Sequence, residues 1–409
     1  MLKRHVPAQR GHCLRVARGF SLVELMVALA LGLLIMTALT GLFVNTSRTN
    51  QEMARTNSQM ENARFALALL KDDLIHGGYW GGFVPAFDDL TNQSTSAPTD
   101  TPTIVPDPCL AYASWASTAG HVNALIGIPV QTHIPSTQCT GVISNQQSST
   151  DVLVVRHAAT CSLIWNGTGF VAESANCPAD VTGAAYFQPG RCTSDASPYV
   201  LGRAGTDTFG MQRRQCDSQR APRMRVVNNI YYIRDFSVTA GDGIPTLVRS
   251  ELGVASSAPS QVAAQALVEG IQGFRVELGV DSLSETNAAV NYSAAIDWQP
   301  AGQWTTATNR GDGVPDGTPP FVHCPTTTRF ACTANTAAAA AALANVVAVR
   351  IWVLARADQA TPGYTDRKTY TLGSEGGGQT LGPFNDGFKR RVFATTVRLV
   401  NVTGRRETP

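Results

Sequence analysis

The clearest pattern in the chain is a long apolar segment near its N-terminus. Residues 20–44 are almost entirely apolar and carry one charge, Glu24. A helix of that length rises about 37 Å, which is enough to cross the hydrocarbon core of a bilayer with some tilt. The segment therefore predicts a membrane-spanning helix.

Helical periodicity continues beyond this segment, although the composition becomes polar. Apolar side chains recur at helical spacing on one face: Met53, Met60, Ala63, Leu67, Leu70 and Leu74. This narrow stripe predicts one continuous helix from near Phe20 to about Ile75, ended by His76-Gly77-Gly78. Residues 45–78 are then the amphipathic half of the helix, which continues onto a folded domain.

The remainder, residues 79–409, has the pattern of strands joined by loops. Alternating or β-branched runs predict strands at Asp151–Arg156, Arg225–Ile233, Thr246–Leu252, Gly273–Val280, Val346–Ala355, Tyr364–Leu372 and Arg390–Val400. The last strand is expected to complete a sheet under the long helix. The fold class is therefore predicted to be α+β, a long N-terminal helix packed on an antiparallel β-sheet.

Three further segments carry local expectations. Residues from Gly81 to about Thr150 have no sustained period and are expected to be irregular. A helical turn or short helix is expected from Gln265, before the strand at Gly273. Thr336 is expected to cap a helix that contains the run Ala337–Ala342.

Composition places most of the chain outside the cytoplasm and argues against nucleic-acid binding. The 409 residues allow one large or two ordinary domains, and only 15% of them are charged. The whole chain has a net charge of +2, but from Phe20 onward 27 basic and 30 acidic residues give −3, so a near-neutral body leaves no electrostatic case for nucleic acid as a partner. Many Gly and Pro residues, 36 and 22, indicate a β-rich and loop-rich extracytoplasmic region.

The first 19 residues are basic and have no acidic residue. Their positive charges are Lys3, Arg4, Arg10, Arg15 and Arg18. Positive charge on one side of an apolar helix keeps that side in the cytoplasm. We therefore expect a single-pass topology, with residues 1–19 inside and the C-terminal domain outside.

A carboxylate inside an apolar helix is energetically costly, so the presence of Glu24 needs an explanation. The residues around it resemble a known signature that supplies one. The run from Gly19 to Met26, Gly-Phe-Ser-Leu-Val-Glu-Leu-Met, resembles the signature of type IV prepilins and of the related type II secretion pseudopilins. The resemblance implies that a prepilin peptidase removes the leader after Gly19 and N-methylates Phe20. It also implies that Glu24 pairs with the terminal amine of a neighbouring subunit during assembly.

Three plainer interpretations compete with this one. The first is a secretory signal peptide, but its small-residue site, Ala28-Leu29-Ala30, lies inside the apolar run and not after it. The second is an ordinary membrane anchor in which Glu24 reaches the membrane interface. The third concerns Glu24 alone, which could pair with the Phe20 amine of its own chain one helical turn away.

The cysteines predict a disulfide-containing exterior domain. Of the nine, Cys13 lies in the leader and the others are Cys109, Cys139, Cys161, Cys177, Cys192, Cys216, Cys324 and Cys332. An even number in an oxidising compartment suggests up to four disulfides. The only pairing that we infer is Cys324 with Cys332. The region of about 109–216 is expected to be a disulfide-tied insertion with a thin apolar core.

The chain shows no motif for catalysis, and we expect neither an enzyme nor a cofactor. His157 and His323 are expected to be surface or structural residues, and the pairs Asp72-Asp73 and Asp88-Asp89 to be solvated. Residues Asn309–Asp316 contain an Asp-Gly pattern in which Asp312 and Asp316 are weak calcium candidates. No bidentate Glu follows at the usual distance, so a Gly/Asp surface turn is the favoured interpretation.

Scattered pieces of the exterior domain resemble one family in particular, the PilW family of minor pilins. They are Asp151–Arg156, Tyr231-Tyr232, Leu247–Arg249, Val268–Asp281 and the two C-terminal strands. The J-type pseudopilins share a weaker version of the middle pieces, and the cysteine-rich region has no counterpart in the pattern.

The resemblance implies a type IV minor pilin at or near the pilus tip, which primes assembly and supports adhesion and twitching motility. Its partners would be other minor pilins, the major pilin, a tip adhesin and the prepilin peptidase. The protein would lie in the bacterial inner membrane before it enters the extracellular pilus. A J-type pseudopilin of a type II secretion system is the alternative, and a membrane-anchored binding module with a cysteine-rich recognition surface is a third.

Overall fold

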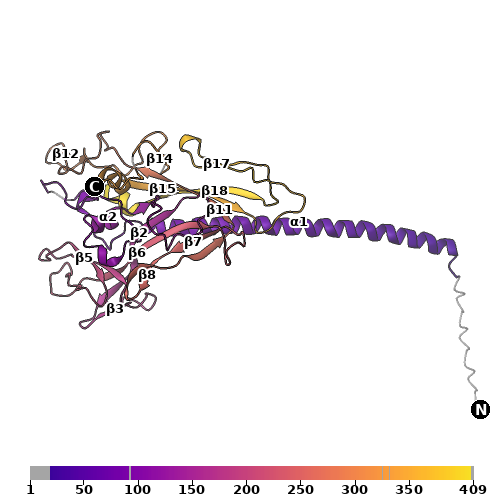
Figure 1. Ribbon diagram of the computed structural model, residues 1–409, viewed down its shortest axis with the longest axis horizontal. Coiled ribbons are helices and arrows are strands. Elements are labelled where there is room, and N and C mark those ends of the chain that lie inside the picture. The colour runs from indigo at the N-terminus through magenta and orange to yellow at the C-terminus, as the bar shows by residue number, and fades with distance from the viewer. Residues whose placement is uncertain (1–18, 92–93, 325, 331, 407–409) are drawn as a thin grey trace, which may run out of the picture. The chain divides into compact units, whose positions relative to one another are not determined.

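The computed structural model describes residues 19–91, 94–324, 326–330 and 332–406 (Figure 1). The leader, with Cys13, lies outside the described residues except for Gly19. The chain divides into two compact units, Met1–Ala54 and Arg55–Pro409. Helix α1, Leu22–His76, begins in the first unit and ends in the second.

Helix α1 has nearly the predicted bounds, and its end has a clear cause. The backbone of Gly78 adopts a φ of +77°, which L side chains rarely tolerate, and its N–H donates to the Arg156 carbonyl at 2.9 Å. The buried face differs from the predicted stripe. Its buried residues are Gln59, Ala63, Ala66, Leu70 and Leu74, whereas Met53 is exposed and Met60 and Leu67 are only partly buried.

The second unit contains two main antiparallel sheets. The larger, eight-stranded sheet has the order β1-β2-β6-β4-β5, with β3 paired to β2 and β7 paired to β6 and β10. Its strands are β1 Val130–Gln131, β2 Leu153–Trp165, β3 Phe170–Ala172, β4 Ala185–Pro189, β5 Tyr199–Arg203, β6 Arg223–Arg234, β7 Thr246–Ser250 and β10 Gln265–Glu269.

The smaller sheet has four strands in the order β14-β11-β15-β18. These are β11 Ile271–Val280, β14 Phe321–Val322, β15 Val346–Arg356 and β18 Arg390–Arg398. Three two-stranded ribbons complete the β-structure: β8 Leu252–Ala255 with β9 Ala258–Gln261, β12 Trp298–Gln299 with β13 Thr306–Ala307, and β16 Tyr370–Leu372 with β17 Gln379–Leu381.

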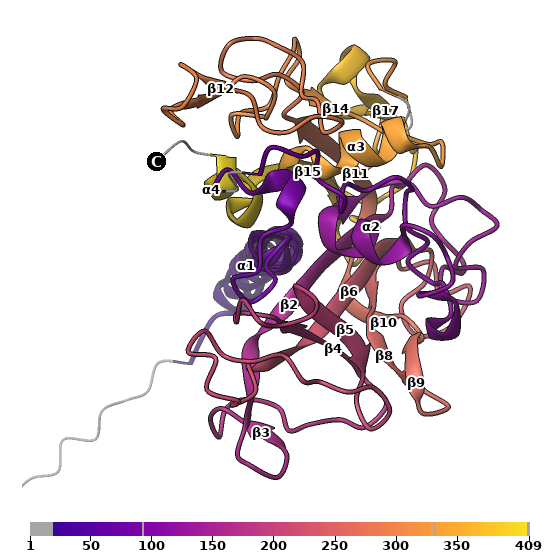
Figure 2. The ribbon, with the colours of Figure 1, turned by 90° about the vertical axis from the view of Figure 1, so that its left-hand side faces the viewer.

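The second half of α1 packs on both sheets and joins them into one core. Ala66 and Leu70 of the helix belong to the same apolar cluster as Leu153 of β2 and Val276 of β11. Figure 2 views the helix nearly end-on, with the β2–β6 side below it and the β11–β15 side beside it. The predicted packing of the helix on antiparallel β-structure is confirmed.

In the described residues, three short α-helices and three 3-10 turns connect the strands or close the fold. Thr336 caps α3 as predicted, because its hydroxyl accepts a hydrogen bond from the Ala339 N–H at 3.2 Å. Besides α1, the elements are α2 His121–Gly127, α3 Ala337–Ala344, α4 Val400–Arg406, η1 Ala86–Asp88, η2 Tyr112–Ser114 and η3 Glu375–Gly377.

Several local predictions were wrong because tertiary contacts decide the short elements. Gln265–Glu269 is strand β10, paired with β7, and not a helical turn. Within the expected strand from Tyr364, only residues from Tyr370 onward are extended and paired. Helix α2 occupies part of the segment expected to be irregular, and the C-terminal strand stops at Arg398, before α4.

All eight cysteines after the leader are paired, each with the next one along the chain. The bonds are Cys109–Cys139, Cys161–Cys177, Cys192–Cys216 and Cys324–Cys332. The cysteine-rich region is nevertheless not thin in apolar core, contrary to expectation. It contributes to two buried clusters, one around Trp80 and Phe187 and the other around Tyr186 and Phe209.

Candidate functional site

The start of α1 is held by two reciprocal hydrogen bonds between Ser21 and Glu24. The Ser21 N–H donates to Glu24 Oε2 at 2.9 Å, and the Glu24 N–H donates to Ser21 Oγ at 3.1 Å. This is a capping box, in which each side chain satisfies a backbone donor that the first helical turn leaves free. In the unprocessed chain, the Glu24 carboxylate is therefore engaged by its own backbone.

The amine partners expected for Glu24 form only on cleavage after Gly19, so both amine pairings stay predictions. The carboxylate bonds to the Ser21 amide, not to the Phe20 nitrogen, and Phe20 itself is 87% exposed. The capping role of Ser21 was not predicted from the sequence. The Ser-x-x-Glu spacing at the start of an apolar run was the signal that could have identified it.

The first half of α1 exposes an apolar surface, and its backbone groups are hydrogen-bonded within the helix. Its exposed large side chains include Leu25, Leu33, Leu34, Leu42 and Phe43. The hydroxyls of Thr37 and Thr40 donate to carbonyls four residues earlier, at 2.7 Å each, so these polar groups also have partners inside the helix. In the described part of the chain, α1 is the helix long and apolar enough to span a membrane. Such a surface requires lipid or other apolar helices to cover it.

Two of the acidic residues expected to be solvated are structural. Asp73 accepts hydrogen bonds from His157, Asn229 and Tyr231. Asp88 is 4% exposed, and Arg406 Nε donates to its Oδ1 at 2.8 Å. Arg406 also reaches Asp281 with Nη1 at 2.9 Å, so the end of α4 is anchored by buried charge pairs.

The Asn309–Asp316 loop uses its polar groups within the fold. Asp316 Oδ2 accepts from the Ser282 and Leu283 N–H groups at 2.6 and 2.7 Å, and Asp312 Oδ1 accepts from the Val314 N–H. Arg310, expected in a surface turn, is 2% exposed and donates to backbone carbonyls. In the described residues, these carboxylates do not form a three-ligand group.

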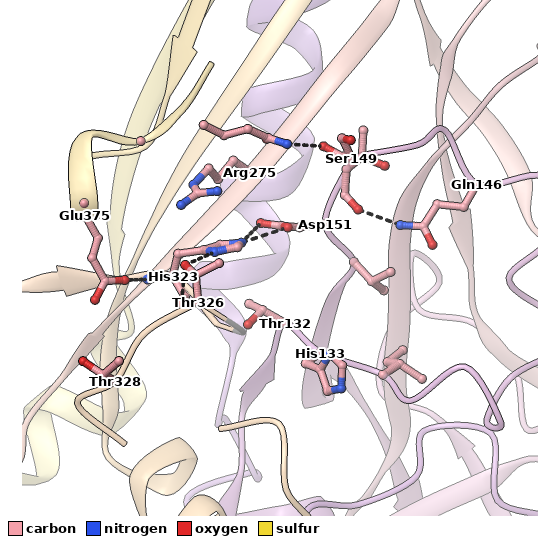
Figure 3. A pocket seen from close by; sticks show the side chains of 16 residues that line it. Thr132, His133, Gln146, Ser149, Asp151, Arg275, His323, Thr326, Thr328 and Glu375 are labelled. Carbon is pink, nitrogen blue, oxygen red and sulfur yellow. Dashed lines mark hydrogen bonds and ion pairs between the residues drawn. The ribbon is translucent and has the colours of Figure 1, made fainter. Parts of the chain in front are cut away.

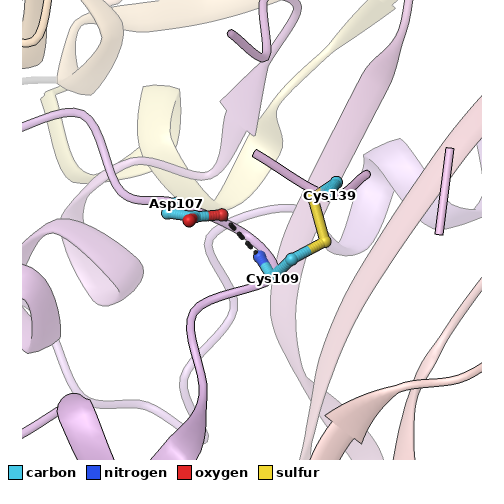
Figure 4. A group of neighbouring side chains, drawn as sticks. All are labelled: Asp107, Cys109 and Cys139. Atoms are coloured by element: carbon cyan, nitrogen blue, oxygen red, sulfur yellow. Dashed lines mark hydrogen bonds between the residues drawn. A yellow bond between two sulfur atoms is a disulfide. The ribbon is translucent and has the colours of Figure 1, made fainter. Parts of the chain in front are cut away.

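In the described residues, one group has potential metal ligands within reach of one another. A disulfide between its two cysteines accounts for this proximity. Asp107, Cys109 and Cys139 lie together, as Figure 4 shows. The two sulfurs form a disulfide, and Asp107 Oδ1 accepts from the Cys109 N–H at 2.9 Å. Metal binding needs thiolates, which a disulfide does not offer, so this group is structural.

A polar cavity of about 810 Å³ lies in the second unit (Figure 3). His323 belongs to its wall and is 4% exposed, so it is not a surface residue. Its Nε2 lies 3.0 Å from Asp151 Oδ1, and its backbone N–H donates to Glu375 Oε2 at 2.6 Å. Arg275, which was not among the predicted site residues, is 7% exposed and lies in the same wall. Its signal was a charged residue within an otherwise apolar strand pattern.

Comparison with known protein families assigns both ends of the chain. Residues 14–40 match the prokaryotic N-terminal methylation motif, and residues 230–401 match the type IV pilus-assembly protein W family, PilW. The chain thus contains a region similar to the PilW family, and the two matches together support a type IV pilus minor pilin of this kind. The region that matches PilW runs from β6 into α4 and so contains the smaller sheet.

Other comparisons add less to this PilW assignment. No curated protein sequence matches the chain. One similar solved structure is a type IV-like pilin, TTHA1219 from Thermus thermophilus, with 10% identity and a TM-score of 0.29. The match covers 84% of this chain and 97% of that chain, but a score this low carries no structural argument.

The family and the fold together give the general class of the protein. The two matches support a pilus-related pilin, and the PilW family is a structural component of pili, not a known enzyme family. The methylation motif and the apolar helix are typical of chains that prepilin peptidase processes and that associate with membranes and with other pilins.

Proposed function

We propose that this protein is a minor pilin, inserted in the inner membrane through the first half of α1 and later built into a type IV pilus at or near its tip. Residues 1–19 would lie in the cytoplasm and the second unit in the periplasm. The observation that supports this most is the combination, on one chain, of the methylation motif, an uncovered apolar half-helix and the PilW region.

In this proposal, prepilin peptidase cuts between Gly19 and Phe20 and methylates the Phe20 nitrogen. Cleavage produces a positively charged amine at Phe20, four residues before Glu24. The amine therefore lies close to Glu24 in membrane depth. Glu24 then exchanges its neutral Ser21 amide partner for the terminal amine of a neighbouring subunit. A charge-assisted hydrogen bond is stronger than one between a carboxylate and a neutral amide, so the exchange is favourable in an apolar environment.

Assembly would proceed by covering the apolar surface of α1. Lateral packing against the corresponding helices of other minor pilins and of the major pilin replaces lipid contacts, and the Glu24–amine pair sets the register. The second unit would then face outward, where it contacts a tip adhesin and supports priming of polymerisation, adhesion and twitching motility.

Processing and pilus incorporation test the proposal. Replacement of Gly19 by Leu should leave a full-length precursor in the membrane and none of the variant in sheared pili. Gly32→Leu is the matched control, because it introduces the same side chain within the apolar half of α1, away from the cleavage site, where no atom lies within 4 Å. Mass analysis should find its N-terminus at methylated Phe20. A mature wild-type chain that begins after Ala30, or is never cleaved, would refute the proposal.

Deletion of the gene separates the pilus function from a role in secretion. We expect loss of surface pili and of twitching, with secretion of type II substrates unchanged. The opposite result would assign the protein to a secretion pseudopilus.

A further inference from the structure

The cavity in Figure 3 has the size and construction of a ligand site. Its volume of about 810 Å³ lies within the range of pockets that enclose small organic molecules. Its walls come from five separate parts of the second unit: the segment after β1, the segment before β2, strand β11, the loop around Thr326 and the loop around Glu375. The Cys324–Cys332 disulfide closes the Thr326 loop, which favours a preformed wall.

Arg275 gives this cavity a positive charge without a partner among the described residues. The side chain is 93% buried, and its Nε has no hydrogen-bond partner. No ion pair or hydrogen bond to its other guanidinium nitrogens occurs in the described part of the chain either. A buried cation is costly unless an anion compensates it.

The nearby carboxylates are already engaged elsewhere. Asp151 accepts from His323 Nε2 and from the Val276 N–H at 2.7 Å, and Glu375 accepts from the His323 N–H. Glu277 lies two residues from Arg275 and accepts from the backbone N–H groups of Ser374 and Glu375. Burial raises the pKa of Glu277, but these hydrogen bonds outweigh it and hold the pKa below its usual value.

Arg275 is also held in place by a close backbone approach. A Cβ at Gly373 would lie 2.5 Å from Arg275 Nε, and Gly373 has a φ of +98°. A glycine there lets the backbone pack directly against the guanidinium. The fold therefore positions the side chain, although no anion among the described residues binds it.

The remaining lining indicates the chemistry of the missing anion. A guanidinium fork matches carboxylate and phosphate equally well in geometry. Asp151 and Glu375 in the same wall would repel a phosphate dianion more strongly than a carboxylate monoanion. The other side chains include hydroxyls and amides that suit the hydroxyl groups of a ligand: Thr132, Gln146, Ser149, Thr326, Thr328 and Gln379.

We propose that this cavity binds a small hydroxylated carboxylic acid of the sugar-acid class, with its carboxylate on Arg275 and its hydroxyls on the surrounding Thr, Gln and carboxylate groups. This site is separate from α1, so it is independent of the assembly function proposed above. A pilin that carries it would combine a structural role with recognition of an acidic saccharide.

Binding to the purified full-length protein in detergent tests the proposal. The probe is D-galacturonate, and the matched neutral ligand is D-galactose, which lacks the carboxylate. Titration calorimetry or saturation-transfer NMR should show galacturonate binding at least about tenfold more tightly than galactose, the value of one charge-assisted hydrogen bond. Inorganic phosphate should bind more weakly than galacturonate.

Two variants and one control locate the site. Arg275→Gln should weaken galacturonate binding by about tenfold or more. Thr328→Trp, at an exposed position on the rim, should block the cavity without burying a new group in the core. Arg214→Gln removes an exposed arginine outside the cavity and should leave binding unchanged. An unchanged thermal unfolding midpoint shows that each variant is folded.

Three outcomes would overturn the proposal. One is equal affinity for galactose and galacturonate, and another is tighter binding of phosphate than of galacturonate. The third is galacturonate binding that survives in folded Thr328→Trp and Arg275→Gln proteins. Failure of the site leaves the assembly function untouched, because pilus incorporation is measured separately.

Discussion

His157 Nε2 lies 2.9 Å from Oδ1 of Asp73, and this pair joins the second half of α1 to strand β2. The other oxygen of Asp73 accepts from Asn229 and from the Tyr231 hydroxyl on β6, each at 3.0 Å. Burial, and then the charge of Asp73, raises the pKa of Tyr231, so this hydroxyl remains a donor at every physiological pH. One carboxylate on the helix thus binds three donors on the larger sheet.

Replacement of Asp73 by Leu should therefore destabilise the second unit. Three buried donors would lose their acceptor, and we expect the free energy of unfolding to fall by about 2–4 kcal/mol. Asp72→Leu is the matched control, because the Asp72 side chain is exposed. The free energy of unfolding should change there by no more than about 0.5 kcal/mol. Urea unfolding of the full-length protein in detergent, followed by near-ultraviolet circular dichroism, measures both. Equal losses in the two variants would show that the contact with the sheet contributes little.

The sequence predicts the elements whose patterns are long enough to be read locally. The bounds of α1 could be predicted from an apolar run and its amphipathic continuation. Strand β15 could be predicted from a run rich in β-branched residues. Helix α4 was missed because seven residues carry no sustained period. Its stability comes from Arg406, whose partners Asp88 and Asp281 are distant in sequence.

The same distinction applies to the sites. Glu24 stands out because its chemical context is contained in a few neighbouring residues. The Asp73–His157 and Asp151–His323 pairs join residues 84 and 172 positions apart, so sequence spacing contains no sign of them. The cavity that contains Arg275 is built from five segments, which come together only after the sheets have formed. Local motifs therefore draw attention to Glu24 but give no sign of the cavity.

His121 should make the stability of the second unit depend on pH. Burial, reinforced by the nearby Arg156 cation, lowers its pKa from 6.5 to about 4. Between these values the unfolded chain binds a proton that the folded chain does not. The folded state should therefore lose stability as the pH falls from about 6.5 to 4, by about 2–3 kcal/mol from this residue.

His121→Leu should remove this contribution. The variant cannot bind the proton in either state, so its free energy of unfolding should change less than that of the wild type between pH 6.5 and 4. The two proteins are compared by urea unfolding at several pH values in this range. Parallel profiles would assign the pH dependence to other groups.

The disulfides should contribute in order of the loops that they close. Cys192–Cys216 spans 24 residues and Cys324–Cys332 spans 8. In the chain-entropy account, removal of these bonds costs about 3.5 and 2.5 kcal/mol, respectively. We expect the Cys192→Ser/Cys216→Ser variant to unfold at a lower urea concentration than Cys324→Ser/Cys332→Ser. The reverse order would mean that strain or residual structure outweighs loop entropy.

The oxidation state of the cysteines is a separate prediction. Alkylation of the unreduced mature protein, followed by mass spectrometry, should modify none of the eight cysteines. Loss of the periplasmic oxidase should lower the amount of protein before it affects cleavage at Gly19, which takes place at the cytoplasmic face. Two or more freely alkylated thiols in the native protein would contradict the four-disulfide structure.

The capping box at the start of α1 allows the charge of Glu24 to be separated from its role as a helix cap. Glu24→Gln keeps an acceptor for the Ser21 N–H but removes the charge, Glu24→Ala removes both, and Ser21→Ala weakens the cap by about 0.5–2 kcal/mol but keeps the charge. All three should insert and be cleaved, since none adds a charge to the membrane segment. If Glu24 pairs with the amine of a neighbouring subunit, both Glu24 variants should be depleted from sheared pili, while Ser21→Ala enters them at nearly wild-type levels. Quantitative immunoblots of pili and of membranes give the ratio. Normal incorporation of Glu24→Gln would restrict Glu24 to its own helix and exclude an intersubunit charge pair.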